Sequence, residues 1–471
     1  MLTDCKSNVT FLKKYQSVKV GLSSIEVPSR VSSIGAEAFS GCSSLASVLI
    51  PSSVTSIGSF AFSGCSSLAS VLIPSRVTSI GSFAFQNCSS LNSLAVEAEN
   101  TMYDSRYDCN AIIETASNTL IAGCATTIIP RSVTAIGDKA FSERTGLTAL
   151  TIPNRVKTIG ENAFEGCSNL AAINIPGSTI SIGYNAFAGC SSLVKSEFAS
   201  IESLCGISFA NPSANPMSVT HCLYVGNNEV SELTFPTDMD TIKKYTFYGC
   251  SNLKSVNIGD YVKVIDVGAF SGCSGLASLS IGDNVGVIGH EAFMGCSSLT
   301  PLFIGKSVRE IGDKVFSGCS SLVSVIIPDR VTIIGDRVFD GCSELSSLAF
   351  GRSVTKIGDY IFGEERNIYP SDIYCYAENP PVAEKTFYYA PIGNITLHVP
   401  ESALDAYENT APWWDFGNIE KSITVGIASV FNNAPTILHR YSPGGQRVDA
   451  GLNGIQVVKM SDGTVRKVLV K

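Results

Sequence analysis

One sequence motif repeats along this chain with a nearly constant spacing. The stretch IGSFAFSGCSSLASVLIP at 57–74 repeats IGAEAFSGCSSLASVLIP at 34–51 almost letter for letter. A fixed period of about 20 to 29 residues is typical of a solenoid, whose units pack only against their neighbours. Although 471 residues would otherwise suggest several compact domains, we expect stacked coils. Aligned on the phenylalanine, twelve units lie mostly 23 residues apart: Phe39, Phe62, Phe85, Phe141, Phe164, Phe187, Phe247, Phe270, Phe293, Phe316, Phe339 and Phe362.

Each unit contains a short strand with one buried face. In LASVLIP, Val48 and Ile50 lie on one side while Ser47 and Leu49 lie on the other, which is the two-residue period of a strand. Pro51 follows and ends the strand, because proline has no N–H to give to a sheet. Stacked units would therefore build a parallel sheet.

The rest of the unit predicts a turn back into the interior. Gly58 permits a tight bend, the next residues close a single helical turn that buries Ala61 and Phe62, and Gly64 suits a left-handed exit. The predicted fold is mostly β: a solenoid of 23-residue coils with a parallel sheet and short helical turns, followed by a small C-terminal β segment.

The idealised unit, V-x-x-I-G-x-x-A-F-x-G-C-S-x-L-x-x-V-x-I-P, resembles the repeat of BspA-like, or treponemal-type, leucine-rich repeat proteins. The resemblance extends over residues 22–400. No asparagine ladder is expected, because Ser53, Arg76, Arg155 or Arg330 stands where other leucine-rich repeats have asparagine. The resemblance implies a leucine-rich repeat protein of the cell surface or a secreted one. Its implied partners are proteins, such as host extracellular matrix or other bacterial surface proteins.

Cysteine recurs at one position of the repeat. Parallel side chains along a stack do not face each other as a disulfide requires, and neither CxxC pairs nor nearby histidines indicate zinc. Because Arg144 and Glu365 replace this cysteine in two units, redox or metal chemistry shared by all units is disfavoured. Buried free cysteine packs as a small hydrophobic residue. We interpret ten of the sixteen cysteines as structural: Cys42, Cys65, Cys88, Cys167, Cys190, Cys250, Cys273, Cys296, Cys319 and Cys342.

The repeat also divides the chain into parts. Two insertions interrupt the solenoid, one at 97–124 and one at 199–229. We predict an irregular N-terminal segment at 1–21, the solenoid at 22–371, a C-terminal cap at 372–421 and a β-rich, sorting-like tail at 422–471.

Both insertions contain strand patterns. In the first insertion, AIIE and TLIA flank Ser117-Asn118 and predict a β-hairpin. The second insertion begins with a loop, and a strand pair is predicted after it, around Gly226-Asn227-Asn228. Insertions in repeat proteins often bind ligands. Alternatively they are architectural, since they resemble insertions frequent in the BspA-like family. Two flanking cysteine pairs are candidates for disulfides: Cys109 with Cys124, and Cys205 with Cys222.

The predicted cap and tail end the repeat. In the cap, ITLHVP would form a last strand, ESALDAYENT a helix, and Trp413 with Trp414 an apolar lid, since a solenoid end must be covered. The alternative is that the tryptophans bind sugar or peptide. In the tail, GIQVVKM and TVRKVLVK flank Ser461-Asp462-Gly463 and predict a hairpin. The tail resembles C-terminal sorting domains of some diderm bacteria, which implies export.

Composition excludes two kinds of partner. Only 16% of residues are charged and the net charge is −8, so no basic surface for nucleic acid is expected. No apolar run reaches about 18 to 20 residues, so we predict no transmembrane segment. The opening MLTDCKSNVTFLKKYQSVKV lacks the features of a secretory signal. Either the chain is cytoplasmic or its true start has been lost, and the resemblance of the tail favours the second.

The sequence contains no catalytic constellation. The four histidines, His221, His290, His398 and His439, are dispersed over an insertion, a repeat turn, the cap and the tail. No nucleophile elbow, phosphate-binding loop or zinc helix motif is present. We therefore predict no catalytic residues, no metal and no cofactor, and a protein that is not an enzyme.

Binding is better supported than catalysis. The outward strand positions are mostly small and lack the Trp, Tyr and Arg anchors of tight interfaces. This predicts weak contacts summed over a long concave face, or recognition by the inserted loops. The candidate ligand-binding residues on that face are Ser47, Ser70, Lys195, Glu197, Asn257, Ser278, Phe303 and Ser324.

A second, lateral position carries charge. Arginine at this position would form a sparse anion-binding stripe, unless aspartates on nearby turns neutralise it. The arginines are Arg30, Arg76, Arg155 and Arg330, and the aspartates are Asp138, Asp313, Asp336 and Asp359.

Two hypotheses remain for the whole chain: a non-catalytic surface protein that mediates protein binding and adhesion, or a structural surface spacer without a dedicated ligand.

Overall fold

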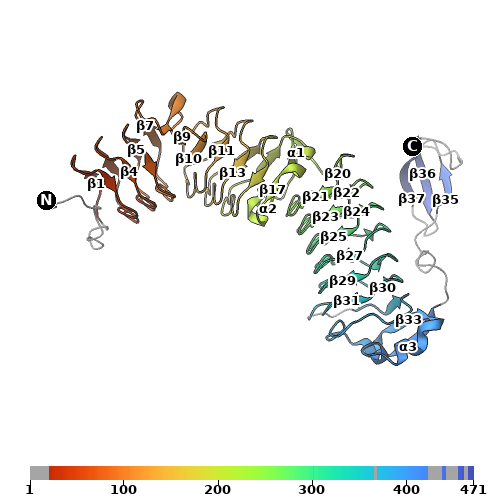
Figure 1. Cartoon of the computed structure of the whole chain (residues 1–471). Coiled ribbons are helices and arrows are strands. Elements are labelled where there is room, and N and C mark those ends of the chain that lie inside the picture. Colours follow the sequence, from red (N-terminus) through yellow and green to blue (C-terminus); the bar gives the residue numbers. More distant parts are fainter. Residues whose placement is uncertain are drawn as a thin grey trace.

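The chain folds into stacked coils that together form an arch. The computed structural model describes residues 21–300, 302–364 and 369–422, and three strands nearer the C-terminus. Of the predicted N-terminal segment at 1–21, only Gly21 lies among the described residues. Figure 1 shows the arch bending where the second insertion contributes α1 (Ile201–Gly206) and α2 (Met217–Thr220). The predicted solenoid of mostly β structure is confirmed.

One side of the coils is a parallel ladder, the first ladder, built from the V-x-I-P segments. Successive strands pair one coil apart, so that Val71 lies opposite Leu94. The strands are β1 (Ser24–Glu26), β3 (Ser47–Leu49), β5 (Ser70–Ile73), β7 (Ser93–Val96), β12 (Ala149–Leu150), β14 (Ala172–Ile175), β16 (Lys195–Phe198), β18 (Tyr224–Val225), β20 (Glu232–Thr234), β22 (Ser255–Ile258), β24 (Ser278–Ile281), β26 (Leu302–Phe303), β28 (Ser324–Ile326) and β30 (Ser347–Phe350).

A second side carries two-residue strands, the second ladder. Each ends in a residue that packs into the core, as Ile57 does. The strands are β2 (Ser33–Ile34), β4 (Ser56–Ile57), β6 (Ser79–Ile80), β11 (Ala135–Ile136), β13 (Thr158–Ile159), β15 (Ser181–Ile182), β17 (Ser208–Phe209), β21 (Thr241–Ile242), β23 (Val264–Ile265), β25 (Val287–Ile288), β27 (Glu310–Ile311), β29 (Ile333–Ile334) and β31 (Lys356–Ile357).

The third side consists of tight turns in place of the predicted helical turn. Ala61 N–H donates to the carbonyl of Gly58 in its own coil at 3.2 Å, whereas Phe62 N–H donates to Ala84 of the next coil at 2.8 Å. A helix would keep these donors within one coil. Alternate donors instead join neighbouring coils, so all three sides of the stack are hydrogen-bonded. The predicted burial of Ala61 and Phe62 is confirmed.

Each turn contains two residues with left-handed backbone. The predicted glycine exit is confirmed at Gly64, where φ is +74°. Two residues before each repeat phenylalanine, a further left-handed residue occurs that sequence reasoning missed, because eleven of the twelve are not glycine. Their φ angles lie between 52° and 61°: Glu37, Phe60, Phe83, Lys139, Asn162, Asn185, Tyr245, Gly268, Glu291, Lys314, Arg337 and Tyr360.

The core is a column of repeated side chains. The rings of Phe39, Phe62 and Phe85 stack with centroids 5.1 and 5.5 Å apart. Burying one such ring contributes about 1.5–3 kcal/mol. Neighbouring backbones approach closely beside this column, since a Cβ on Gly58 would lie 2.3 Å from the nitrogen of Ala36. This close approach favours glycine at the I-G position of the repeat, where Lys243 and Asp266 stand in two other coils.

The repeat cysteines form a second column, and their thiols donate hydrogen bonds to the preceding coil. The Sγ of Cys65 donates to the carbonyl of Phe39 in the preceding coil at 3.1 Å, and Cys296 donates to Phe270 at 3.4 Å. Burial raises the pKa of Cys167 to about 12, which disfavours the reactive thiolate. The ten repeat cysteines are all buried, as a structural role requires.

The first insertion contributes β8 (Tyr103–Asp104), η1 (Arg106–Asp108), β9 (Ala111–Glu114) and β10 (Thr119–Gly123). Strands β9 and β10 pair antiparallel, which confirms the predicted hairpin, and β10 pairs with β11 of the second ladder. Cys109 and Cys124 are both free, so this candidate disulfide is absent.

Arg144 spans the break that this insertion makes. It occupies the cysteine position of its coil and is fully buried, and burial lowers its pKa. Its guanidinium donates to the carbonyls of Gly123 at 2.9 Å, Ser142 at 3.1 Å and Phe85 at 2.7 Å. The last is the bond that a repeat cysteine makes to the preceding phenylalanine. Arginine thus replaces cysteine where the previous coil is too distant for a thiol. The other replacement, Glu365, lies outside the described residues.

The second insertion is more ordered than its sequence indicates. Beside α1 and α2 it contains η2 (Pro212–Ala214), and β18 pairs antiparallel with β19 (Asn228–Glu229), which confirms the predicted strand pair. The helices were missed because they are too short for a helical period, although Ser200 and Ser203 form a capping box at α1. Cys205 and Cys222 are free, so the second candidate disulfide is also absent.

The predicted cap region continues the first ladder. It adds β32 (Asp372–Cys375), η3 (Ile392–Asn394), β33 (Thr396–Pro400), η4 (Glu401–Ala403), α3 (Leu404–Glu408), η5 (Trp413–Asp415) and β34 (Asn418–Ser422). The expected strand and helix are present. Trp413 is buried and its Nε1 donates to the carbonyl of Pro381 at 2.9 Å, but Trp414 is 53% exposed. The predicted lid therefore consists of one tryptophan, not two.

The C-terminal strands form their own antiparallel sheet in the order β35 (Ile437–Tyr441), β36 (Gly454–Met460), β37 (Val465–Val470). Pairing of β36 with β37 agrees with the predicted hairpin, while its turn, Ser461-Asp462-Gly463, lies outside the described residues. Within the described part of the chain, no helix is long and apolar enough to cross a membrane.

Candidate functional site

The outward side chains of the first ladder form a long surface, which we call the first-ladder face. Ser47 lies opposite Ser70 in the parallel register, and Ser278 lies opposite Ser255, so short hydroxyl side chains form rows. Larger apolar side chains interrupt the rows: Leu49 is 58% exposed and Phe303 is 63% exposed. Of these two features, the exposed apolar side chains are the ones that suit contact with another macromolecule.

The eight predicted residues on this face do not form one cluster. Four separate sheets carry them: Ser47 and Ser70 lie in the sheet of β1 to β7, Lys195 and Glu197 in that of β12 to β19, Asn257, Ser278 and Phe303 in that of β20 to β26, and Ser324 in that of β28 to β34. Six of them are exposed, while Lys195 and Glu197 are half-buried.

The curvature of the face differs from the expectation. The candidate residues were predicted on a concave side. Figure 1 places the short strands β21 to β31 toward the inside of the arch, and the first-ladder strands β20 to β24 toward its outside. We therefore name the surface by its ladder.

Lys195 is held by neighbours that the second insertion brings onto the face. Its Nζ lies 3.0 Å from Oε2 of Glu197, donates to Oδ1 of Asn227 at 2.8 Å, and lies 5.2 Å from the ring centroid of Tyr224. The predicted pair Lys195 and Glu197 is thus largely satisfied within the chain. Tyr224 and Asn227 were missed as neighbours, since only the fold of the insertion brings them there.

A second cluster lies on β32, β33 and β34. The Nε2 of His398 is 2.9 Å from Oδ1 of Asp372, its Nδ1 is 3.7 Å from Glu420, and its ring stacks on Tyr374 at 4.3 Å. Burial opposes ionisation of Asp372, but hydrogen bonds from Ser371 and His398 outweigh it and hold its pKa below the usual value. Alternation in the cap strands placed these residues on one face, a pattern that sequence analysis left unused.

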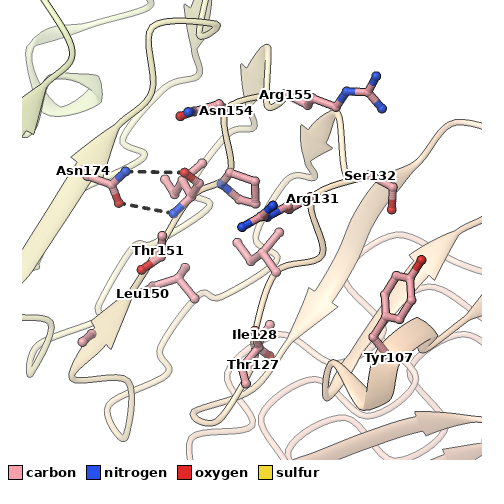
Figure 2. Close-up of a pocket in the computed structure, with 14 residues that line it drawn as sticks. Tyr107, Thr127, Ile128, Arg131, Ser132, Leu150, Thr151, Asn154, Arg155 and Asn174 are labelled. Carbon is pink, nitrogen blue, oxygen red and sulfur yellow. Dashed lines mark hydrogen bonds between the residues drawn. The ribbon is translucent and has the colours of Figure 1, made fainter.

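A hollow of about 1270 Å³ lies where the first ladder is interrupted between β7 and β12. Figure 2 shows its walls, with Tyr107 on one side and Asn174 on the other. The hollow was not predicted. Its lining residues are Tyr107, Thr127, Ile128, Ile129, Arg131, Ser132, Ala149, Leu150, Thr151, Ile152, Pro153, Asn154, Arg155 and Asn174.

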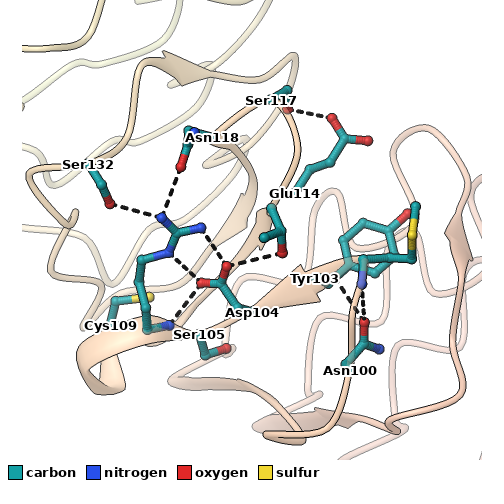
Figure 3. Close-up of polar contacts among 12 residues, drawn as sticks. Asn100, Tyr103, Asp104, Ser105, Cys109, Glu114, Ser117, Asn118 and Ser132 are labelled. Carbon is teal, nitrogen blue, oxygen red and sulfur yellow. Dashed lines mark hydrogen bonds and ion pairs between the residues drawn. The ribbon is translucent and has the colours of Figure 1, made fainter.

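The first insertion fixes one wall of this hollow. Arg106 donates to Asp104 Oδ1 at 2.7 Å, to Asn118 Oδ1 at 2.9 Å and to Ser132 Oγ at 3.1 Å. Figure 3 shows Asp104, Asn118 and Ser132 around this guanidinium. The network ties η1 and the hairpin to the coil that follows, and it leaves Tyr107 on the surface with 88% exposure.

Three of the four lateral aspartates accept backbone N–H groups from the next coil, and the arginine stripe stays a prediction. Asp313 accepts the backbone N–H of Asp336 at 2.8 Å, and Asp336 accepts that of Asp359 at 2.8 Å. Asp138 likewise accepts the N–H of Glu161. These carboxylates therefore join successive coils through hydrogen bonds to the backbone.

The described residues supply no assembled reaction centre. No group of three or more His, Cys, Asp or Glu in this part of the chain could hold a metal ion. Burial also raises the pKa of Cys190 to about 12 and that of Cys375 to about 11. The arrangement offers surfaces, a hollow and satisfied polar clusters, which are elements of binding.

The chain belongs to the BspA-type leucine-rich repeat family. The family model for a BspA type leucine rich repeat region matches residues 13–120, 112–222, 219–323 and 287–410. No curated protein matches the chain.

Among solved structures, a leucine rich cell surface protein from Faecalibacterium prausnitzii is 26% identical, with 55% of this chain and 59% of that chain covered and a TM-score of 0.37. The chain thus spans less than two thirds of that protein. A leucine-rich repeat protein from Bacteroides ovatus is 24% identical over 85% and 84% of the two chains, with a TM-score of 0.37. The pneumococcal vaccine antigen PcpA is 18% identical over 85% and 78%, with a TM-score of 0.36.

Proposed function

We propose that this chain is a non-catalytic bacterial surface or secreted protein that binds other proteins through its first-ladder face. One observation carries the proposal: exposed apolar side chains recur on that face, at Leu49, Leu72 and Phe303, although the coils have a complete core without them. Covering such apolar side chains with a partner removes them from water, which favours binding. Family membership and the surface proteins among similar structures support the same role. Adhesion to host matrix or to other bacterial surface proteins is the biological form we propose.

The predicted partition extends this proposal. We propose that residues 22–371 present the binding surface, that 372–421 cap it, and that 422–471 act as a sorting tail. The tail is tested by fusing residues 422–471 to a secreted reporter in a diderm host. Surface retention of the reporter is expected, and release to the medium equal to that of the reporter alone would contradict a sorting role.

The binding role is tested with the full chain against purified extracellular-matrix and bacterial surface proteins, by biolayer interferometry. The triple variant Leu49→Ser, Leu72→Ser, Phe303→Ser should bind less tightly than the wild type. The matched control is Ile180→Ser with Ile333→Ser, which removes exposed apolar groups outside the first-ladder face. Equal loss in both variants would contradict a specific face.

The rows of short hydroxyl side chains favour one alternative, a structural spacer without a dedicated ligand. Ser47, Ser70 and Ser278 offer little surface to an interface. A spacer predicts that neither the wild type nor the variants bind any protein of the panel. It also predicts that surface display of the chain is unchanged by the triple substitution.

A further inference from the structure

The first ladder has a gap between β7 and β12. Each is the outermost strand of its own sheet, and the coil between them contributes residues 125–130 without entering either sheet. Ile128 N–H donates to the carbonyl of Cys109 at 3.0 Å, so the first insertion occupies the β7 side of this segment. The other side of the segment faces β12 across the hollow.

Backbone groups on both walls of the hollow are unpaired. The side-chain amide of Asn174 pairs with the N–H and carbonyl of Ile152 at 3.3 and 3.4 Å, on the side of β14. Successive residues of an extended chain direct their backbone groups to opposite sides. Thr151 therefore presents its own to the hollow, and Ile129 does so from the facing wall. Among the described residues, neither backbone forms a hydrogen bond.

The hollow is also positively charged. Arg131 and Arg155 lie in its lining, and none of the fourteen lining residues is acidic. In Figure 2 Arg131 points across the hollow toward the side of Thr151 and Asn174, while Arg155 projects from the rim. Beside them, Ile128 is 76% exposed and offers an apolar contact.

We propose that this hollow binds an extended segment of a partner protein that carries an acidic residue. The segment would take the place of the missing strand and form parallel ladder bonds with Ile129 on one side and Thr151 on the other. Strand addition of this kind gains affinity from main-chain hydrogen bonds and specificity from side-chain pockets. Arg131 and Arg155 follow the strand positions, so they receive a carboxylate near the C-terminal end of the segment.

The unpaired backbone groups decide in favour of a polypeptide over an acidic sugar. Donors and acceptors facing each other across a slot match the alternating N–H and carbonyl groups of an extended chain. Arginines alone would suit either ligand. The proposal rests on the proposed protein-binding function and names the class of ligand and its location.

The test selects dodecapeptides from a random display library against the full chain. Enriched peptides are expected to contain Asp or Glu in a β-prone stretch. The double variant Arg131→Glu, Arg155→Glu should lower their affinity at least about tenfold, because charge complementarity becomes repulsion. The control Arg330→Glu places the same charge at a lateral position outside the hollow, and it should leave affinity unchanged. Circular dichroism confirms that all variants fold.

Two further measurements distinguish strand addition from simple charge attraction. Amide hydrogen exchange should slow at Ile129 and Thr151 when the selected peptide is bound. A peptide with alternate backbone nitrogens methylated should lose binding, because it cannot form the ladder.

Several outcomes would overturn the proposal: no enriched acidic peptide, equal binding by Arg131→Glu, Arg155→Glu and the wild type, or full binding by the N-methylated peptide. Binding of heparin that this double variant abolishes, without any selected peptide, would reassign the hollow to acidic sugars. If matrix proteins bind the wild type and the double variant equally, the proposed function survives and the strand-addition site does not.

Discussion

The regular stack from β21 to β31 and the interrupted stretch from β7 to β12 are built from the same repeat but differ in how neighbouring coils are hydrogen-bonded. In the regular stack, the second-ladder strands β21 to β31 form one continuous sheet, backbone hydrogen bonds also join the coils on the turn side, and Phe270 stacks on Phe247 at 5.1 Å. In the interrupted stretch, an insertion separates the coils, Arg144 takes a cysteine position, and the first ladder has a gap. Where the repeat is regular, most backbone groups are hydrogen-bonded between coils. Where it is interrupted, some backbone N–H and carbonyl groups stay unpaired and can bind a partner.

The largest effect is expected in the regular stack. Replacing Phe270 by alanine removes a fully buried ring from the column and should lower the free energy of unfolding by about 3–5 kcal/mol. Phe303→Ala is the control, since its ring is exposed and such changes alter stability by about 0.5 kcal/mol or less. Urea unfolding followed by circular dichroism measures both. Similar losses for the two variants would refute the core column.

The interrupted stretch is tested by restoring the repeat. Arg144→Cys returns the consensus residue, yet it should destabilise the protein by about 2–3 kcal/mol, because the carbonyls of Gly123 and Phe85 lose their donors. The matched change in the regular stack, Cys296→Arg, should prevent folding, since that position has no room for a guanidinium. Thermal unfolding compares them. A variant Arg144→Cys as stable as the wild type would show that the bridge across the break contributes nothing.

The cysteine column predicts a pH dependence of intermediate size. Burial raises the pKa of Cys167 and of Cys190 from 9.0 to about 12, so the folded chain keeps protons that the unfolded chain loses. Their contribution is therefore constant below about pH 9, and stability falls as the pH rises from there toward 12. Unfolding in urea at pH 8 and pH 10 should show this decline. Cys167→Ala should reduce the slope; an unchanged slope would contradict the assignment.

The smallest effect is expected at the surface. Lys306 Nζ lies 2.7 Å from Oδ2 of Asp283 in the preceding coil, and its hydrogen bond lowers the pKa of Asp283. Both groups are solvent-exposed, and exposed ion pairs contribute little. Lys306→Ala should leave the thermal midpoint unchanged in calorimetry. A clear drop would mean that surface pairs between coils, and not the core columns, hold the regular stack.

Much of the fold followed from the sequence because the repeat imposes it. The period, the alternation around Val48 and Ile50, the exit at Gly64 and the hairpin around Ser117-Asn118 were all predicted, since each depends on local residue chemistry. The left-handed turn at Phe60 was not, because hydrogen bonds to the next coil impose it on a residue that does not favour it.

The candidate site was less predictable. The outward positions on each strand could be derived from alternation, but the hollow could not. It arises from where the first insertion displaces residues 125–130, and its walls include Tyr107 and Arg155, which are 48 positions apart in the sequence. The short helices α1 and α2 were missed for a similar reason, since tertiary packing and not a helical period defines them.

Amide hydrogen exchange on the free chain is the most direct test of the difference between the two regions. The account predicts slow exchange at Phe270 and Phe293, whose N–H groups are bonded to the following coil at 2.8 and 3.0 Å, and fast exchange at Ile129 and Thr151. Equal protection at all four amides would show that the interruption leaves no unpaired backbone, and it would contradict the account.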